Sequence, residues 1–151
     1  MNLSPGGQSE LAIAIIEKFG PRFAADAIVL YLGDAANKFV INEQERLEHL
    51  WVPITLHDKL PDIILFHEVN NWLYLIEAVI SHGPVSHKRK YELEKLLQDC
   101  TAIPVYISAF LDLAAFSRHT LNIAWKTHVW IAETPEHMIH YNGEKFLGPY
   151  K

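Results

Sequence analysis

The sequence lacks the features that mark secreted or membrane-embedded proteins. Its single cysteine, Cys100, allows no intramolecular disulfide, which fits the reducing cytoplasm. No uninterrupted apolar stretch approaches the ~20 residues of a membrane-spanning helix. The first seven residues, MNLSPGG, lack the basic and apolar segments of a signal peptide. We therefore expect a cytoplasmic protein with no membrane association.

Positive charge is also scarce. Lysine and arginine total 13 against 18 aspartates and glutamates, which gives a net charge of −5. This balance argues against a protein that coats nucleic acid without specificity. It does not exclude an enzyme acting on DNA, because acidic catalytic residues and a bound metal contribute opposite local fields. With 151 residues, half of them hydrophobic, residues 1–151 should form a single domain with a substantial core.

Two apolar runs in the middle of the chain form a candidate β-hairpin. They cover residues 62–66 and 72–79, and the turn-like stretch 68–71 separates them. A four-residue hairpin loop would make His67 face Trp72. Both alternating sets of side chains in the second run are apolar, which is typical of a strand covered on both faces.

The same register brings two carboxylates together. Asp62 opens the first run, Glu77 closes the second, and the pairing places them directly opposite each other on one face. Their Cβ atoms would then lie ~5 Å apart, where like charges repel. A divalent cation such as Mg²⁺ or Mn²⁺ reverses the sign of that interaction, because it prefers hard oxygen ligands. The sequence thus predicts a metal site on the hairpin, and a one-residue change in loop length would break it.

Each acid also has a plain structural interpretation. A Pro-Asp pair such as Pro61-Asp62 can simply start a strand from a turn. A glutamate at a strand end such as Glu77 can cap the following turn.

The remaining elements follow from apolar periodicity and breaker residues. The expected elements are a helix over 9–19 ended by Gly20-Pro21, strands at 27–32 and 39–41, a helix over 43–50, the hairpin, a helix from an N-cap at Ser86 to about Gln98, a strand at 103–107, a helix over 111–126, and short strands at 128–131 and 138–141. Pro104 suggests that its strand lies at a sheet edge or starts there. We expect an α/β fold.

This order resembles the core of the PD-(D/E)XK nuclease fold, a mixed β-sheet flanked by helices with an α-β-β-β-α-β core, here followed by a C-terminal helix and short strands. More narrowly, the chain resembles the C-terminal catalytic region of the BsuBI/PstI family of type II restriction endonucleases. The segments that carry the resemblance are LSPGGQ (3–8), GDAANK (33–38), LPD (60–62), EAVISHGP (77–84) and NGEKFLGPY (142–150). Such enzymes carry an additional N-terminal domain that these residues lack. We therefore expect a domain of a longer enzyme, a truncated product or a solitary relative.

The resemblance implies a magnesium-dependent endonuclease that cuts double-stranded DNA at a palindromic site as a homodimer, with Mn²⁺ as a substitute metal. It carries over Asp62 and Glu77 as metal ligands, with the Ala78 carbonyl as a third. In this nuclease fold an acid from the first helix sometimes joins the metal site, and Glu10 is the candidate here.

One position departs from the nuclease signature, which places a lysine two residues after the second acid. Here that residue is Val79, which cannot stabilise a charge. The candidates for the missing cation are Lys88 and Arg89, at the start of the next helix, and His82, which is closer in sequence. Positive charge at a helix start opposes the macrodipole by up to ~1 kcal/mol, which favours a phosphate-facing role. The alternative is a solvated helix face.

The departure at Val79 leaves a second function open. The chain would then be a catalytically inactive DNA-binding or oligomerisation remnant of such an enzyme. A third, weaker alternative is a metal-dependent hydrolase of small phosphoesters, which only the carboxylates suggest.

The nine histidines do not form a zinc motif. None is joined to a cysteine pair or lies in a His-Glu-x-x-His helix, so the sequence predicts no zinc site.

Overall fold

A computed structural model describes residues 6–34, 38–53 and 59–143, and the side chains of 34 and 38–40 are excluded. The first, second and last of the segments that carry the family resemblance therefore lie partly outside the described residues. No helix among the described residues is long and apolar enough to cross a bilayer.

The core of the molecule is a seven-stranded sheet with strand order β2-β1-β3-β4-β5-β6-β7. The strands are β1 (Ile28–Asp34), β2 (Lys38–Asn42), β3 (Ile63–His67), β4 (Trp72–Ala78), β5 (Ile103–Phe110), β6 (Thr127–Ile131) and β7 (Ile139–Tyr141). β4 and β6 run parallel to β5, which lies between them, and the other neighbours are antiparallel. The predicted α/β class and mixed sheet are confirmed.

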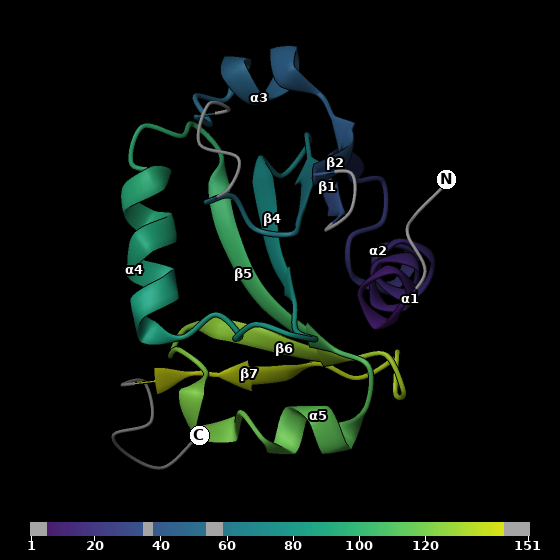
Figure 1. Cartoon of the computed structure of the whole chain (residues 1–151). Coiled ribbons are helices and arrows are strands. Elements are labelled where there is room, and N and C mark those ends of the chain that lie inside the picture. Colours follow the sequence, from purple (N-terminus) through teal and green to yellow (C-terminus); the bar gives the residue numbers. More distant parts are fainter. Residues whose placement is uncertain (1–5, 35–37, 54–58, 144–151) are drawn as a thin grey trace.

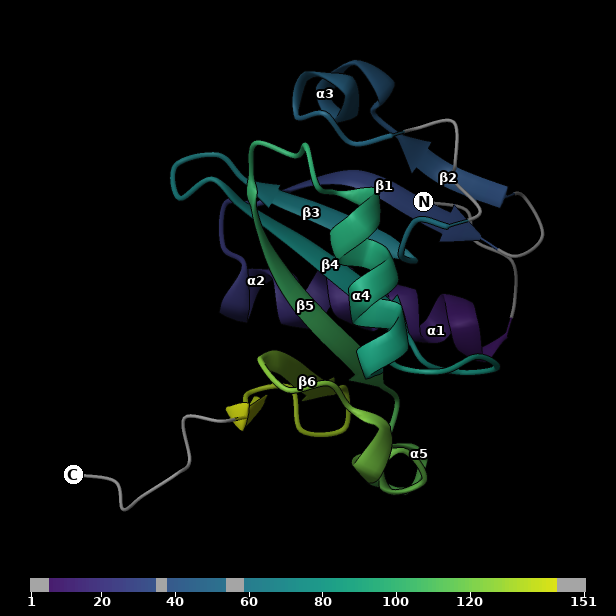
Figure 2. The ribbon, with the colours of Figure 1, turned by 90° about the vertical axis from the view of Figure 1, so that its left-hand side faces the viewer.

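Helices cover both faces of this sheet (Figures 1 and 2). The helical elements are α1 (Gly7–Ala14), a π-helical stretch η1 (Ile15–Phe19), α2 (Gly20–Phe23), α3 (Gln44–His49), α4 (His87–Leu96), α5 (Leu113–Ser117) and a 3₁₀ turn η3 (Thr120–Asn122). The α1–η1–α2 segment lies on one side of the central strands, and α4 lies on the other. The predicted α-β-β-β-α-β core is present, with β2 and α3 inserted after β1.

Each face of β4 belongs to a different hydrophobic cluster, as the alternation of its residues predicts. Tyr74 and Ile76 pack into the first core cluster, together with Phe19 of η1 and Trp130 of β6. On the opposite face, Leu73 and Leu75 pack into the second core cluster, which includes Leu93 of α4. A third core cluster surrounds Val79 and Phe110, where the sheet meets α5.

The register of the central hairpin agrees with the prediction. His67 pairs with Trp72, and the ladder continues to Ile63 opposite Ile76. Glu68–Asn71 is therefore the four-residue connection, and Asn71 adopts a left-handed conformation with φ 59°. Continued by one residue, the ladder sets Asp62 opposite Glu77.

The expected end of the first helix at Gly20-Pro21 is wrong, because helical backbone continues to Phe23. Pro21 stands in the first turn of α2, where its missing N–H is not needed and its fixed φ suits a helix. Directly before α2, the π-helical stretch η1 changes the spacing of the backbone hydrogen bonds.

The expected helix over 111–126 is also wrong, since α5 covers only Leu113–Ser117. Asp112 caps its start by accepting a hydrogen bond from the Ala115 N–H at 2.8 Å. At its end the Ser117 hydroxyl donates to the Ala114 carbonyl at 2.7 Å. Serine, threonine and asparagine compete for nearby backbone groups in this way, and Thr120 and Asn122 follow within five residues.

Pro104 lies near the start of β5, as predicted, although β5 lies between β4 and β6 in the sheet. β6 pairs with β5 only from Ile107 onward, so at Pro104 the strand has a neighbour on the β4 side alone. A proline there interrupts no ladder on the open side.

Packing of α4 predicts a stability difference between two leucines. Leu93 is fully buried in the second core cluster, whereas Leu121 is 96% exposed. We expect Leu93→Ala to lower the free energy of unfolding by about 2–5 kcal/mol, because it removes buried methyl groups and leaves a cavity. Leu121→Ala should change it by less than about 0.5 kcal/mol. Urea denaturation of both variants measures the difference, and equal midpoints would contradict the packing.

Candidate metal centre

The centre begins with the two carboxylates of the β3–β4 hairpin. The Gly33 N–H donates to the Asp62 carbonyl at 2.9 Å, so the backbone of Asp62 points toward β1. Asp62 and Glu77 therefore face each other at a position where β3 and β4 exchange no backbone hydrogen bonds. At such positions the two strands, and the side chains on them, come closest together.

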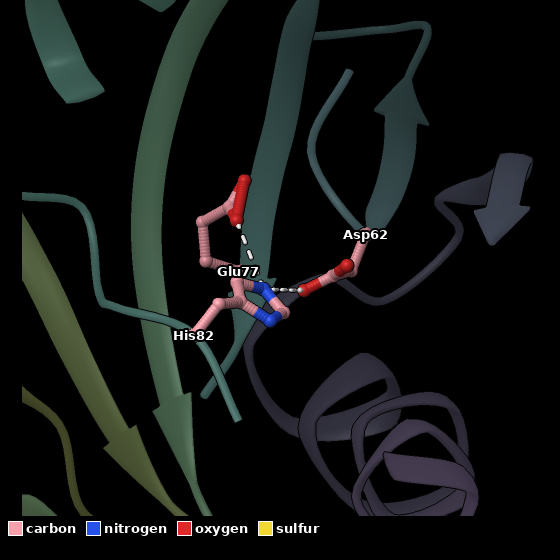
Figure 3. A group of neighbouring side chains, drawn as sticks. All are labelled: Asp62, Glu77 and His82. Atoms are coloured by element: carbon pink, nitrogen blue, oxygen red, sulfur yellow. Dashed lines mark hydrogen bonds and ion pairs between the residues drawn. The ribbon is translucent and has the colours of Figure 1, made fainter. Parts of the chain in front are cut away.

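His82 lies between the two acids (Figure 3). Its Nε2 is 3.0 Å from Asp62 Oδ2 and 3.6 Å from Glu77 Oε2. One ligand atom from each residue falls within 4.8 Å of the other two, so the three form a group that could hold a metal ion. Hydrogen bonds to Asp62 and Glu77 outweigh burial and raise the pKa of His82 to about 10. In this arrangement the imidazolium supplies the positive charge that two facing carboxylates require.

Arg89 provides the second positive charge. Its Nη2 lies 3.1 Å from Glu77 Oε1, and Glu77 is only 3% exposed. A carboxylate buried to that extent needs paired charge and hydrogen bonds. Arg89 stands in the first turn of α4, and the N-cap hydroxyl of Ser86 accepts a hydrogen bond from its backbone N–H at 3.1 Å. The helix cap and the ion pair thus fix the same residue.

The backbone of Ala78 completes the contacts of Asp62. Its N–H donates to Asp62 Oδ2 at 2.8 Å. In an extended strand the N–H and the carbonyl of one residue point to the same side. That is the direction a carbonyl ligand at Ala78 requires.

The other predicted residues lie apart from this group. Glu10 is exposed on α1 and does not belong to the three-residue ligand group. Lys88 is exposed on α4, and Val79 is buried in the third core cluster. Lys90 donates to the Trp125 carbonyl at 3.3 Å. Of the basic side chains of α4, Arg89 is the one that contacts the carboxylates.

Sequence reasoning missed Ser108, which pairs with Glu77 across β4 and β5. This serine is fully buried, and its hydroxyl accepts a hydrogen bond from the Val85 N–H at 2.9 Å. The contact anchors the segment between β4 and α4 that carries His82. Its sequence signal is a single serine inside the largely apolar run from Ile103 to Phe110.

Chemically, the centre suits a hard divalent cation. The two carboxylates supply oxygen donors of the kind that Mg²⁺ and Mn²⁺ prefer. The donor set therefore fits the predicted class of metal.

A family model and two relatives all point to restriction endonucleases. The family model described as "BsuBI/PstI restriction endonuclease domain" matches residues 1–144. The type II restriction enzyme BsuBI of Bacillus subtilis is 46% identical over 149 residues, covering 99% of this chain and 47% of BsuBI. The type II restriction enzyme AplI of Arthrospira platensis is 31% identical over 157 residues, covering 97% of this chain and 47% of AplI.

A solved structure shows the same fold. The SdaI restriction endonuclease matches with a TM-score of 0.87 and 39% sequence identity, covering 99% of this chain and 47% of SdaI. The predicted restriction-endonuclease-like fold is confirmed. The chain spans about half the length of the relatives it matches.

The anchoring role of Ser108 predicts a specific loss. Ser108→Ala leaves the Val85 N–H buried without its acceptor, so we expect stability to fall by about 1–3 kcal/mol. The released segment should also move His82 away from the carboxylates, seen as a fall in the His82 pKa in a histidine NMR titration. The exposed Ser117→Ala is the matched control and should change neither quantity. An unaltered His82 titration in Ser108→Ala would refute the anchoring role.

Proposed function

Because the chain belongs to the BsuBI/PstI restriction endonuclease family, we propose that it is the catalytic domain of a type II restriction endonuclease. In this proposal it hydrolyses DNA phosphodiester bonds at a palindromic site with the help of a divalent metal. The observation that carries it is the convergence of Asp62 and Glu77 on one group of ligand atoms. Hydrolysis joins the oxygen of a water to phosphorus and breaks the bond to the 3′ oxygen. The products are a 5′-phosphate and a 3′-hydroxyl.

The cofactor in this proposal is Mg²⁺, with Mn²⁺ as a substitute. Asp62, Glu77 and the Ala78 carbonyl would hold it, and Glu10 stays a further predicted ligand. When bound, such an ion lowers the pKa of a water and polarises a non-bridging phosphate oxygen. The protein contributes the fixed positions of the two carboxylates, which the register of the hairpin sets.

We assign the role of the missing lysine to cations from outside β4. Arg89 holds Glu77 in place through the 3.1 Å ion pair, and is a positioning residue. His82 is 44% exposed beside the two carboxylates, and in this proposal its charge would face the phosphate of the substrate. Positive charge there stabilises the charge that develops on the phosphate oxygens in the transition state.

The partners in this proposal are duplex DNA and a second copy of the chain. A palindromic site has two-fold symmetry, which a homodimer matches with one centre for each strand. Lys88 is exposed next to Arg89, and in this proposal it would contact a DNA phosphate. The enzyme would act in the cytoplasm, in keeping with its single cysteine.

Removal of either carboxylate tests the assignment of the ligands. We expect Asp62→Ala and Glu77→Gln to lower plasmid cleavage in Mg²⁺ or Mn²⁺ by more than about a hundredfold, because loss of a direct ligand should exceed the effect of losing an outer contact. The exposed Asp99→Asn is the control and should keep full activity. Cleavage that survives in both Asp62→Ala and Glu77→Gln would refute the ligands.

Calorimetric titration with Mn²⁺ tests metal binding separately from DNA cleavage. Binding that disappears in Asp62→Ala supports the metal centre whether or not the chain cuts DNA. Tight binding without cleavage of any duplex would instead indicate the inactive remnant.

Substitution of two neighbouring residues of α4, Arg89 and Lys88, tests which of them supplies the cation that acts on Glu77. We expect Arg89→Ala to lower kcat by about 10–100-fold, since it releases Glu77. Lys88→Ala should leave kcat within about threefold of the wild type and weaken DNA binding. The slope of the logarithm of the binding constant against the logarithm of the salt concentration should become shallower by about one unit. Single-turnover cleavage and salt-dependent binding measure the two effects. Equal kcat values for both variants would contradict the distinction.

A further inference from the structure

Two histidines meet on the last pair of strands, where no part of the proposed nuclease mechanism needs them. His128 of β6 lies directly opposite His140 of β7. Their Nδ1 atoms are 2.6 Å apart, and the ring planes are nearly perpendicular at 89°. In sequence the two are twelve positions apart, so no local spacing motif marks them.

The pair lies on the sheet face opposite to the carboxylates. His128 alternates with Val129 and shares its face with Trp130, a member of the first core cluster. Glu77 shares its face with Leu75, a member of the second core cluster. β6 and β7 are also separated from β4 by β5, and Figure 1 shows them at the far end of the sheet from β1 and β2.

The contact between the two nitrogens is a hydrogen bond in which one ring donates its Nδ1 proton and the other accepts it. Only one proton can lie between two imidazole nitrogens, and a second positive charge there is unfavourable. Burial, and then the charge of His140, lowers the pKa of His128, so its ring is neutral at neutral pH. A neutral imidazole is a good ligand for transition metals. A cation bound to both nitrogens replaces the shared proton.

We propose that His128 and His140 form a chelating site for a borderline divalent transition metal ion of tetragonal geometry, Cu²⁺ or Ni²⁺, separate from the carboxylate centre. Bonds of ~2.0–2.1 Å at a right angle place two nitrogens about 2.9 Å apart, so a shift of about 0.3 Å opens the pair to a metal. Among the described residues, no third His, Cys, Asp or Glu joins the pair in a group within 4.8 Å. Water completes the coordination.

The chemistry of the pair sets its selectivity. Imidazole nitrogens favour Cu²⁺ over Ni²⁺, disfavour Mn²⁺, and do not compete for Mg²⁺, which requires oxygen ligands. The histidine pair would therefore bind Cu²⁺ or Ni²⁺ in the presence of Mg²⁺. A bound ion would also join the edge strand β7 to β6 through side chains, in addition to the three paired positions of their ladder.

The test is Ni²⁺ and Cu²⁺ titration of the untagged chain by calorimetry, at about pH 7.5, where an ordinary imidazole is largely neutral. His140 is exposed, so His140→Ala should fold. We expect it to bind one equivalent fewer of each ion than the wild type. His137→Ala, three residues away and 75% exposed, is the matched control and should bind as the wild type does. Equal stoichiometry in the wild type and His140→Ala, or the same loss in His137→Ala, would overturn the site.

Electron paramagnetic resonance of the bound Cu²⁺ gives an independent readout. The wild type should show hyperfine coupling to two imidazole nitrogens in a component that is absent from His140→Ala and from His128→Ala. A spectrum identical in the three proteins would overturn the proposal. Plasmid cleavage in Mg²⁺ by His140→Ala should stay within about twofold of the wild type, so failure here and failure of the nuclease assignment are distinguishable. A large loss of cleavage would contradict the separation of the two sites.

Discussion

Two negative charges held face to face are the constraint on which this molecule depends. Asp62 and Glu77 come from adjacent strands at a position of closest strand approach, and Glu77 is almost fully buried. Without positive charge nearby, such a pair would repel and one of the acids would take up a proton. The structure supplies that charge through His82 and Arg89. A metal would meet the same electrostatic need, which is why a repulsive arrangement can persist in a folded protein.

The elements that follow β4 are arranged to deliver these cations. The chain leaves β4, passes through the segment that carries His82, and enters α4, whose first turn carries Arg89. Two hydrogen bonds fix Val85 in this segment: its N–H donates to the Ser108 hydroxyl, and its carbonyl accepts from the Ala124 N–H at 2.9 Å. The buried side of the sheet therefore determines the geometry of the exposed site. A change in β5 can alter the centre without touching either carboxylate.

Much of this arrangement could be predicted from sequence because it is local. The hairpin has a short loop and a two-residue period, so its register, and with it the meeting of Asp62 and Glu77, follows from counting residues. Contacts between distant segments could not be counted in this way. Ser108 and the pair His128–His140 depend on the pairing of β5 with β4 and of β6 with β7, and each pairing is joined by a long or irregular connection. The prediction of a helix over 111–126 was wrong for a different reason, since α5 ends at Ser117, whose hydroxyl bonds to the Ala114 carbonyl.

The cations of this site come from outside β4, and tertiary packing at the end of β4 explains why the lysine of the nuclease signature is absent there. A lysine at position 79 would lie two residues after Glu77, but β4 ends at Ala78 and Val79 turns into the third core cluster against Phe110. A lysine amine buried there would lose its hydration without gaining a partner and would tend to lose its proton. The apolar cluster at the end of β4 and a charged side chain at position 79 are thus incompatible. A fold that keeps this cluster has to bring its cation from another part of the chain. The segment that carries His82 and the first turn of α4, which carries Arg89, are the next parts that reach Glu77.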